Sequence, residues 1–430
     1  MKPLFVISCP FDTYSGYGAR SRDLVKAIIE TNKYEVMLLP QRWGNTPFGF
    51  CDDNPEWGFL KNHMLASPQL PKQPEIWMQI TVPNEFQPLG KYNIGVTAGI
   101  ESTICPPEWI DGVNRMDLTL VSSNHTKKVF EESKFELKNK ETNITERKIE
   151  LTKPVEVLFE GADTNIYKVI DTPCSLDIQI KEKFAYLFVG HWMAGDMGED
   201  RKNVGLLVKA FLETFKNKMN KPALILKTSQ VSSSYYDREE ILKKIKQIRK
   251  TVNSNNLPNI YLLHGDFSDE EMNEIYNHSK VKAMISLTKG EGYGRPLLEF
   301  TLSKKPLIAT GWSGHLDFLD PKLTNLVGGQ LTNVHPSTQN QFLLPEAMWF
   351  SPDLSQVGFY LKDVFENYKN YTDKAKRQAF KSKNEFSFNK MKEKIDDILT
   401  EVIPEFPQEV KLTLPQLKKI ELPKLQKING

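Results

Sequence analysis

Short apolar runs alternate along the chain with longer stretches in which apolar residues recur every three or four positions. Pro, Gly or Asn bounds each of the early runs, which is typical of buried strands. The predicted strands lie at 4–8, 34–39, 75–81, 92–97, 118–122 and 155–159, and the predicted helices between them at 19–30, 107–114 and 125–133. Alternating strands and helices predict a parallel sheet that is covered by helices on both faces.

A second alternating series begins near residue 184. Its predicted strands lie at 184–189, 223–227, 259–264, 281–287 and 306–310, and its predicted helices at 203–217, 236–253, 269–278 and 296–303. Ser268 and Glu271 form a capping-box pattern at the start of one of these helices. Two such series imply two Rossmann-like domains with a cleft between them, and ligands bind beyond the carboxyl ends of strands in such sheets.

Two segments depart from this alternation. Phe135–Lys153 is dense in Lys, Glu, Asn and Thr, which indicates an exposed insertion or a hairpin. After Pro404, the stretch Leu414–Ile420 is nearly repeated as Leu422–Ile428. Its spaced prolines prevent a regular helix, so this Lys-rich tail is expected to be either an extended segment packed on the body or a disordered basic tail.

Composition narrows the class of protein. A length of 430 residues predicts two or three domains. The balance of 56 Lys and Arg against 54 Asp and Glu excludes a global basic field for nucleic acid. No apolar stretch is long enough to predict stable membrane insertion. The four cysteines are far apart and form no C-x-x-C pair, which argues against a zinc site or a disulfide framework and favours a cytoplasmic location.

The strongest chemical signal is the loop that follows the predicted strand at 281–287. Three glycines between 290 and 294 allow the backbone to approach a ligand closely, and Pro296 opens a helix. Glu291 and Glu299 are eight positions apart, one in the loop and one in the helix, so both are expected to face one pocket. The alternative is a tight strand–helix turn with solvated acids.

Three weaker signals also lie at predicted strand ends. Phe188-Val189-Gly190-His191 precedes Arg201 and Lys202 at a helix entrance, where two cations suit a diphosphate, although a solvated basic corner is the alternative. Gly16-Tyr17-Gly18 lies in the first loop but lacks the spacing of a dinucleotide fingerprint. Gly311–His315 could line the cleft or form a plain loop.

Taken in order, these motifs resemble those of the GT-B retaining glycosyltransferases of the family-four type (glycosyl transferases group 1), over nearly the whole chain. The E-x7-E element from Glu291 to Glu299 is that family's hallmark. The turn at 160–163 resembles the family's domain junction, 266–269 its segment near the nucleotide base, and 385–387 the point where its chain crosses back to the first domain.

The resemblance implies an α/β, GT-B fold in which two Rossmann-like doubly wound domains face each other across a cleft. Residues 1–163 would form an N-terminal acceptor domain, and 164–388 a C-terminal domain that binds a nucleotide-sugar donor. A crossing helix, 389–403, would return to the first domain, and 404–430 would be a tail.

The family's residue roles carry over to matching positions. Lys202 and Arg201 would hold the donor diphosphate, Glu299 the donor ribose, and Glu291 hydroxyls of the transferred sugar. Tyr293 and Gly294 would present backbone N–H groups. The full set of implied donor-binding residues is Gly16, Gly18, Gly190, Arg201, Lys202, Asp266, Glu291, Tyr293, Gly294, Arg295, Leu297 and Glu299.

Two positions depart from the family pattern. His191 stands where the family often has Arg, and Arg201 is expected to replace that charge. The family's His near the reacting sugar is missing from the segment around Thr81. Glu101 or Thr81 is expected to face the acceptor instead, and the catalytic set is therefore Glu291, Lys202, Arg201 and Glu101. A structural role for Glu101 is the alternative.

The implied activity is retaining transfer of a sugar from a nucleotide-diphosphate sugar to a hydroxyl acceptor, which would be a glycan, a lipid or a modified nucleobase. The leaving diphosphate can accept the acceptor's proton, so no cofactor and no catalytic metal are expected. The alternatives are a catalytically silent GT-B scaffold that binds a sugar or a partner, a sugar-nucleotide-binding protein, and a nucleotide-sugar epimerase. The sequence predicts neither the acceptor nor the oligomeric state.

Overall fold

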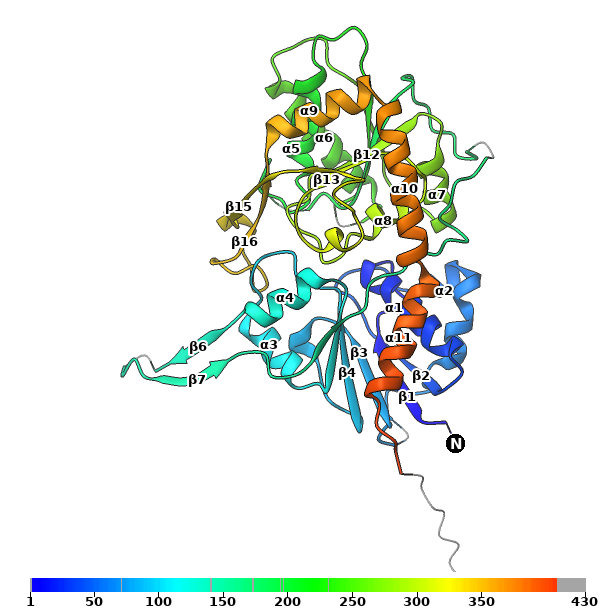
Figure 1. Ribbon diagram of the computed structural model, residues 1–430, viewed down its shortest axis with the longest axis vertical. Coiled ribbons are helices and arrows are strands. Elements are labelled where there is room, and N and C mark those ends of the chain that lie inside the picture. The colour runs from blue at the N-terminus through cyan, green and yellow to red at the C-terminus, as the bar shows by residue number, and fades with distance from the viewer. Residues whose placement is uncertain are drawn as a thin grey trace, which may run out of the picture.

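The computed structural model describes residues 2–70, 72–139, 141–171, 174–193, 195, 197–230 and 232–407. Two six-stranded parallel sheets form two halves that lie one above the other in Figure 1, in the strand orders β2-β1-β3-β4-β5-β8 and β11-β10-β9-β12-β13-β14. The predicted α/β architecture of two Rossmann-like halves is therefore confirmed. Within the described residues, no helix combines the length and apolar character needed to cross a bilayer.

The N-terminal half is built on a sheet whose central strands are buried. Its strands are β1 Leu4–Cys9, β2 Glu35–Pro40, β3 Ile76–Ile80, β4 Tyr92–Thr97, β5 Leu118–Val121 and β8 Val155–Val157. Its helices are α1 Gly16–Glu30, α2 Phe50–Asp53, α3 Pro107–Asn114 and α4 Asn124–Glu132, with 3-10 turns η1 Pro55–His63 and η2 Pro83–Glu85. Helices α1 and α11 pack together, while α3 contacts η2.

The C-terminal half repeats this plan. Its sheet contains β9 Ala185–Val189, β10 Ala223–Lys227, β11 Ile260–Leu263, β12 Val281–Ser286, β13 Leu307–Thr310 and β14 Asn325–Val327, and β15 Gly329–Asn333 pairs with β16 Met348–Pro352. Its helices are α5 Val204–Phe215, α6 Tyr235–Thr251, α7 Asp269–Asn277, α8 Arg295–Thr301, α9 Leu354–Glu366 and α10 Lys369–Glu385, with turns η3 Gly314–Asp317 and η4 Pro336–Thr338.

Several local predictions can be checked directly. Residues 135–149 form an antiparallel hairpin of β6 Phe135–Lys138 and β7 Thr145–Ile149, one of the two predicted forms. Ser268 and Glu271 form the predicted capping box at α7. The placement of Gly16 and Gly18 in a loop is wrong, because the Ser15 hydroxyl accepts the Gly18 N–H at 2.9 Å and starts α1 at Gly16.

The chain crosses between the halves where two distant segments meet. The Ala162 N–H donates to the Phe386 carbonyl at 3.0 Å, and the Phe388 N–H donates to the Ala162 carbonyl at 2.8 Å. A Cβ on Gly161 would lie 2.6 Å from the Phe388 Cα, so only glycine permits this approach. Helix α11, Phe388–Val402, then packs on α1 (Figure 1). Most of the predicted tail, 408–430, lies outside the described residues.

Candidate active site

A cavity of about 540 Å³ opens between the two halves. Side chains of α1, of the loop before it and of the segment 50–59 form one wall. The ends of β9 and β10, the loop after β11, helix α7 and the start of α8 form the other. Four of the predicted donor-binding residues line this cavity, and they are Gly16, Asp266, Arg295 and Glu299.

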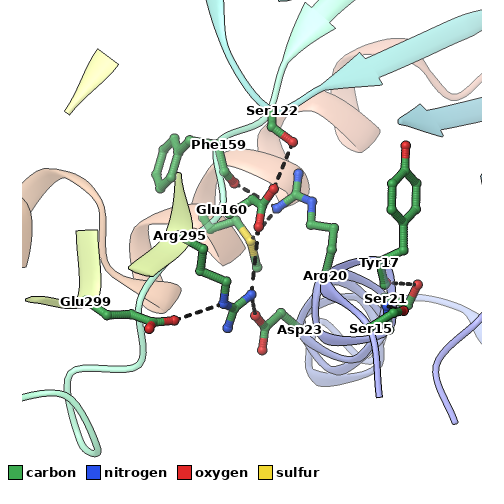
Figure 2. A network of polar contacts seen from close by, with 12 residues as sticks. Ser15, Tyr17, Arg20, Ser21, Asp23, Ser122, Phe159, Glu160, Arg295 and Glu299 are labelled. Carbon is green, nitrogen blue, oxygen red and sulfur yellow. Dashed lines mark hydrogen bonds and ion pairs between the residues drawn. The ribbon is translucent and has the colours of Figure 1, made fainter. Parts of the chain in front are cut away.

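Arg295 is the ionic centre of this cavity. Its guanidinium lies 2.6 Å from a carboxylate oxygen of Asp23 on α1, 3.1 Å from Glu299 one turn along α8, and 3.9 Å from Glu160. Figure 2 shows the three carboxylates converging on Arg295 from both halves. One guanidinium therefore bridges α1, the junction turn and α8 at the floor of the cleft.

Glu299 is nearly covered and shares its cation with two other acids. Burial raises the pKa of Glu299 to about 8, although Arg295 and the hydroxyl of Tyr276, 3.2 Å away, act in the opposite direction. The nearby charge of Asp269 adds to the increase. A carboxyl with this pKa can donate or accept a hydrogen bond near neutral pH.

A buried arginine holds the junction turn against α1. Arg20 donates to the backbone carbonyl of Phe159 at 2.9 Å (Figure 2). It also donates to the backbone carbonyl of Leu158 at 2.5 Å. Ser122 donates to Glu160 at 3.1 Å, which fixes the carboxylate that faces Arg295. The position of Glu160 thus depends on α1, β5 and the chain just after β8 together.

A second ionic cluster joins Glu291 to the two predicted phosphate-binding cations. The Lys202 ammonium lies 2.5 Å from one oxygen of Glu291, and the Arg201 guanidinium lies 3.5 Å from the other. Arg201 also lies 3.4 Å from Glu101, which comes from the N-terminal half. These four residues are the predicted catalytic set, and the structure brings them together.

Backbone contacts hold this second cluster in place. The Glu291 N–H donates to the Ser313 hydroxyl at 2.9 Å, and Arg201 donates to the Gly290 carbonyl at 2.8 Å. A Cβ on Gly290 would lie 1.9 Å from the Glu101 carbonyl oxygen, so the two halves touch at their backbones here. The close approach explains why glycine precedes Glu291.

The charge state of Glu291 differs from that of Glu299. Burial alone would raise the pKa of Glu291, but the adjacent Lys202 and Arg201 outweigh it and lower that pKa to about 2. The expectation that both glutamates face one pocket is not met, because Glu299 lines the cavity and Glu291 is not among the residues that line it. Its carboxylate is instead occupied by its two cations.

The remaining predicted residues lie behind these clusters. Gly190 follows Val189, which lines the cavity, and a Cβ on Gly190 would lie 3.9 Å from the Lys202 Cδ. Gly294 has a φ of 98° and caps α8, a backbone conformation that favours glycine. Tyr293 and Leu297 are core residues with 3% and 4% of their surfaces exposed, and their side chains do not line the cavity.

Gly18 and Thr81 have structural contacts. A Cβ on Gly18 would lie 2.3 Å from the Thr13 carbonyl oxygen, so Gly18 packs beneath the loop before α1. The Thr81 hydroxyl is buried and donates to Glu85. Of the two residues expected to face the acceptor, Glu101 is the one that contacts the ionic cluster.

Sequence reasoning missed the part of the cavity wall that α1 provides. Arg22, Asp23 and Lys26 line the cavity from this helix. Polar residues at positions 22, 23 and 26 of the predicted first helix were the available signal, since positions three or four apart share one helix face. The ion pair between Asp23 and Arg295 could not be predicted from neighbouring residues, because Arg295 comes from the other half.

No protein-family model matches the chain, and no curated protein sequence matches it. A sucrose-phosphate synthase from Thermosynechococcus elongatus matches in structure with a TM-score of 0.60, at 10% identity, over 94% of this chain and 99% of its own. A glycosyltransferase from Rickettsia africae matches with a TM-score of 0.58, at 14% identity, over 94% and 99%. HepE from Anabaena, solved with UDP and glucose, matches with a TM-score of 0.54, at 12% identity, over 93% and 100%. The chain has the GT-B fold, as predicted.

Proposed function

We propose that the protein is a retaining glycosyltransferase of the family-four type that transfers a sugar from a nucleotide-diphosphate sugar to a hydroxyl acceptor. One observation carries this proposal. Two cations, Arg201 and Lys202, converge on Glu291 in a GT-B cleft while Glu299 lines the adjoining cavity. Several structural neighbours are glycosyltransferases, and HepE was solved with UDP-glucose, which supports a sugar nucleotide as the donor.

The cations suit a diphosphate for physical reasons. Lys202 supplies a compact point charge and Arg201 a fork of donors, and both side chains are only 16% exposed. Charge stabilisation is stronger in such a covered site than in open water. In this proposal the diphosphate competes with Glu291 for Lys202 and Arg201. The released Glu291 carboxylate then accepts hydrogen bonds from hydroxyls of the transferred sugar.

The proposed reaction needs no protein base with a pKa near neutrality. The bond between the anomeric carbon and the diphosphate oxygen breaks as the acceptor oxygen forms its bond to the same carbon on the same face. The acceptor's proton passes to the leaving diphosphate, so charge and atoms balance. The protein positions both substrates and stabilises the growing negative charge through Lys202 and Arg201.

Lys202→Ala tests this assignment. Donor binding is first found by thermal shift with a panel of UDP-, GDP- and ADP-sugars, because a ligand of the folded form raises the melting temperature. Hydrolysis and transfer of the sugar are then followed by product analysis. We expect the variant to lose roughly 100- to 1,000-fold in kcat, as for a lost donor to a developing oxyanion.

The matched control is Lys218→Ala, an exposed lysine of the same half, which should keep wild-type turnover. Lys202→Arg retains the charge and should keep more activity than Lys202→Ala. Melting temperatures of all variants show whether each one folds. Near-wild-type turnover by Lys202→Ala would remove Lys202 from the proposed role, and a wild type that binds no sugar nucleotide would overturn the function itself.

A further inference from the structure

The cavity that Glu299 lines also has aromatic residues from both halves in its walls. From the C-terminal half, Phe267 follows β11, and the Lys227 ammonium lies 5.4 Å from its ring centre. From the N-terminal half, Phe50, Trp57 and Phe59 line the same cavity. The doubly wound plan accounts for the first side, because ligands bind beyond strand ends, but it does not account for the second.

The segment 50–59 is held firmly in this position. The Arg22 guanidinium lies 3.4 Å from the centre of the Phe50 ring and donates to the carbonyls of Phe11 and Thr13 at 2.8 and 3.0 Å. The Cys51 N–H donates to the Asp12 carboxylate at 2.7 Å. These contacts anchor the start of the segment to the loop after β1, so it forms a fixed wall of the cavity.

Trp57 and Phe59 are the parts of this wall that remain available. Their rings lie 6.2 Å apart with an interplanar angle of 26°, and both are only partly buried. The Lys26 ammonium lies 5.5 Å from the Trp57 ring. Partly exposed, nearly parallel rings beside a cation provide the kind of surface on which a nucleobase stacks.

The assignments made above leave one part of the donor for this wall. The diphosphate is assigned to the cluster of Lys202 and Arg201, and the ribose to Glu299, so the nucleobase remains. Asp266 and Trp57 line the same cavity as Glu299, whereas Lys202 and Arg201 do not. Its volume of about 540 Å³ lies within the ~300–1,000 Å³ typical of small-molecule sites.

We infer that the nucleobase of the donor binds between the two halves, against the aromatic side chains of Trp57 and Phe59, so that the segment 50–59 of the N-terminal half recognises the nucleoside. This inference rests on the proposed function and extends it, since it places part of the donor site outside the C-terminal half. Nucleotide binding then helps to hold the two halves together, alongside the ion pair between Asp23 and Arg295.

The test is calorimetric titration of the full chain with UDP, GDP and ADP, and with inorganic pyrophosphate. Trp57→Ala should weaken binding of the preferred nucleoside diphosphate by roughly 5- to 150-fold, the range measured for loss of one stacking ring. It should leave the affinity for pyrophosphate unchanged, because pyrophosphate has no base. Phe59→Ala should act in the same direction.

Two variants serve as controls. Trp57→Phe keeps an aromatic face and should retain most of the affinity. Phe48 is an exposed aromatic residue just before the segment 50–59, and its side chain does not line the cavity. Phe48→Ala should therefore bind nucleotides as the wild type does.

The outcomes separate this inference from the proposed function. Wild-type affinity in both Trp57→Ala and Phe59→Ala, with affinity lost in Glu299→Ala, would overturn the aromatic wall and leave the function standing. Equal weakening of nucleotide and pyrophosphate by Trp57→Ala would show that Trp57 acts through the fold, which also overturns the inference. A wild type that binds none of the three nucleotides would overturn both.

Discussion

Glu291 and Glu299 come from one short motif, are both buried, and have opposite charge preferences. Glu291 faces two cations, and its pKa falls to about 2. Burial raises the pKa of Glu299 to about 8, because the single guanidinium of Arg295 only partly offsets the burial. The comparison teaches that motif spacing places a buried carboxyl at the cleft, while the cations that offset its burial decide its protonation.

The same contrast separates the two clusters in space. The Glu291 cluster is closed, because each cation is already paired and none of its four members lines the cavity. The Arg295 cluster is open, because Arg295, Asp23 and Glu299 all line it. Under the proposed function, a donor would enter beside Glu299, and its diphosphate would displace the contact between Lys202 and Glu291.

The largest effect is expected at the shared guanidinium. Arg295→Met removes the guanidinium that pairs with Asp23, Glu160 and Glu299, and removal of one partner from a buried ion pair costs about 3 kcal/mol or more. We expect the free energy of unfolding to fall by about that amount in urea titrations. Asp23→Asn removes one of three carboxylates and should cost less.

The matched control is Lys218→Met, which also introduces Met but replaces an exposed cation of the same half. If Arg295→Met were as stable as this control, the three carboxylates would not depend on Arg295 for compensation, and the contrast between an open and a closed cluster would lose its basis.

The next effect concerns pH and has opposite signs at the two glutamates. The pKa of Glu291 is lowered from 4.5 to about 2, so ionised Glu291 stabilises the fold above pH 4.5, and this stabilisation is lost as the pH falls towards 2. Glu291→Gln should be less stable than the wild type by about 2 kcal/mol at neutral pH, the contribution of a charged hydrogen bond. This difference in unfolding free energy should shrink as the pH falls.

Glu299→Gln provides the mirror image. The pKa of Glu299 is raised from 4.5 to about 8, so its neutral form stabilises the fold below pH 4.5, and this contribution is lost as the pH rises through 8. The wild type should lose stability relative to Glu299→Gln over that window. Parallel pH profiles for the two variants in urea titrations would show that the glutamates share one environment.

Much of the scaffold was predictable because its signals are local. Alternation of apolar runs predicted β4 at Tyr92–Thr97 and β10 at Ala223–Lys227, and a proline start at Pro296 predicted the helix α8, which spans Arg295–Thr301. Helix α1 begins earlier than predicted because the Ser15 cap outweighs the glycines that follow it. Local rules thus located the strand ends on which the ionic clusters lie.

The wall of the cavity could not be predicted in the same way. The turns at 50–63 are short and contain Gly, Pro and Asn, and the first of them is fixed by Arg22 and Asp12 rather than by its own propensity. Asp23 acquires its role only when Arg295 arrives from the other half. Such contacts depend on the packed arrangement of distant segments, which no window of sequence records.

The smallest effect is expected at the contact between the halves in the closed cluster. Glu101→Gln removes the ion pair with Arg201, at 3.4 Å, from a side chain that is 34% exposed. Partly exposed pairs contribute about 0–1 kcal/mol, so the unfolding free energy should change little. Arg201 loses one competing carboxylate, however, and the affinity for pyrophosphate should rise slightly in calorimetric titration. A large loss of stability would instead show that Glu101 holds the two halves together, and the closed cluster would then depend on the interface more than on Lys202 and Glu291.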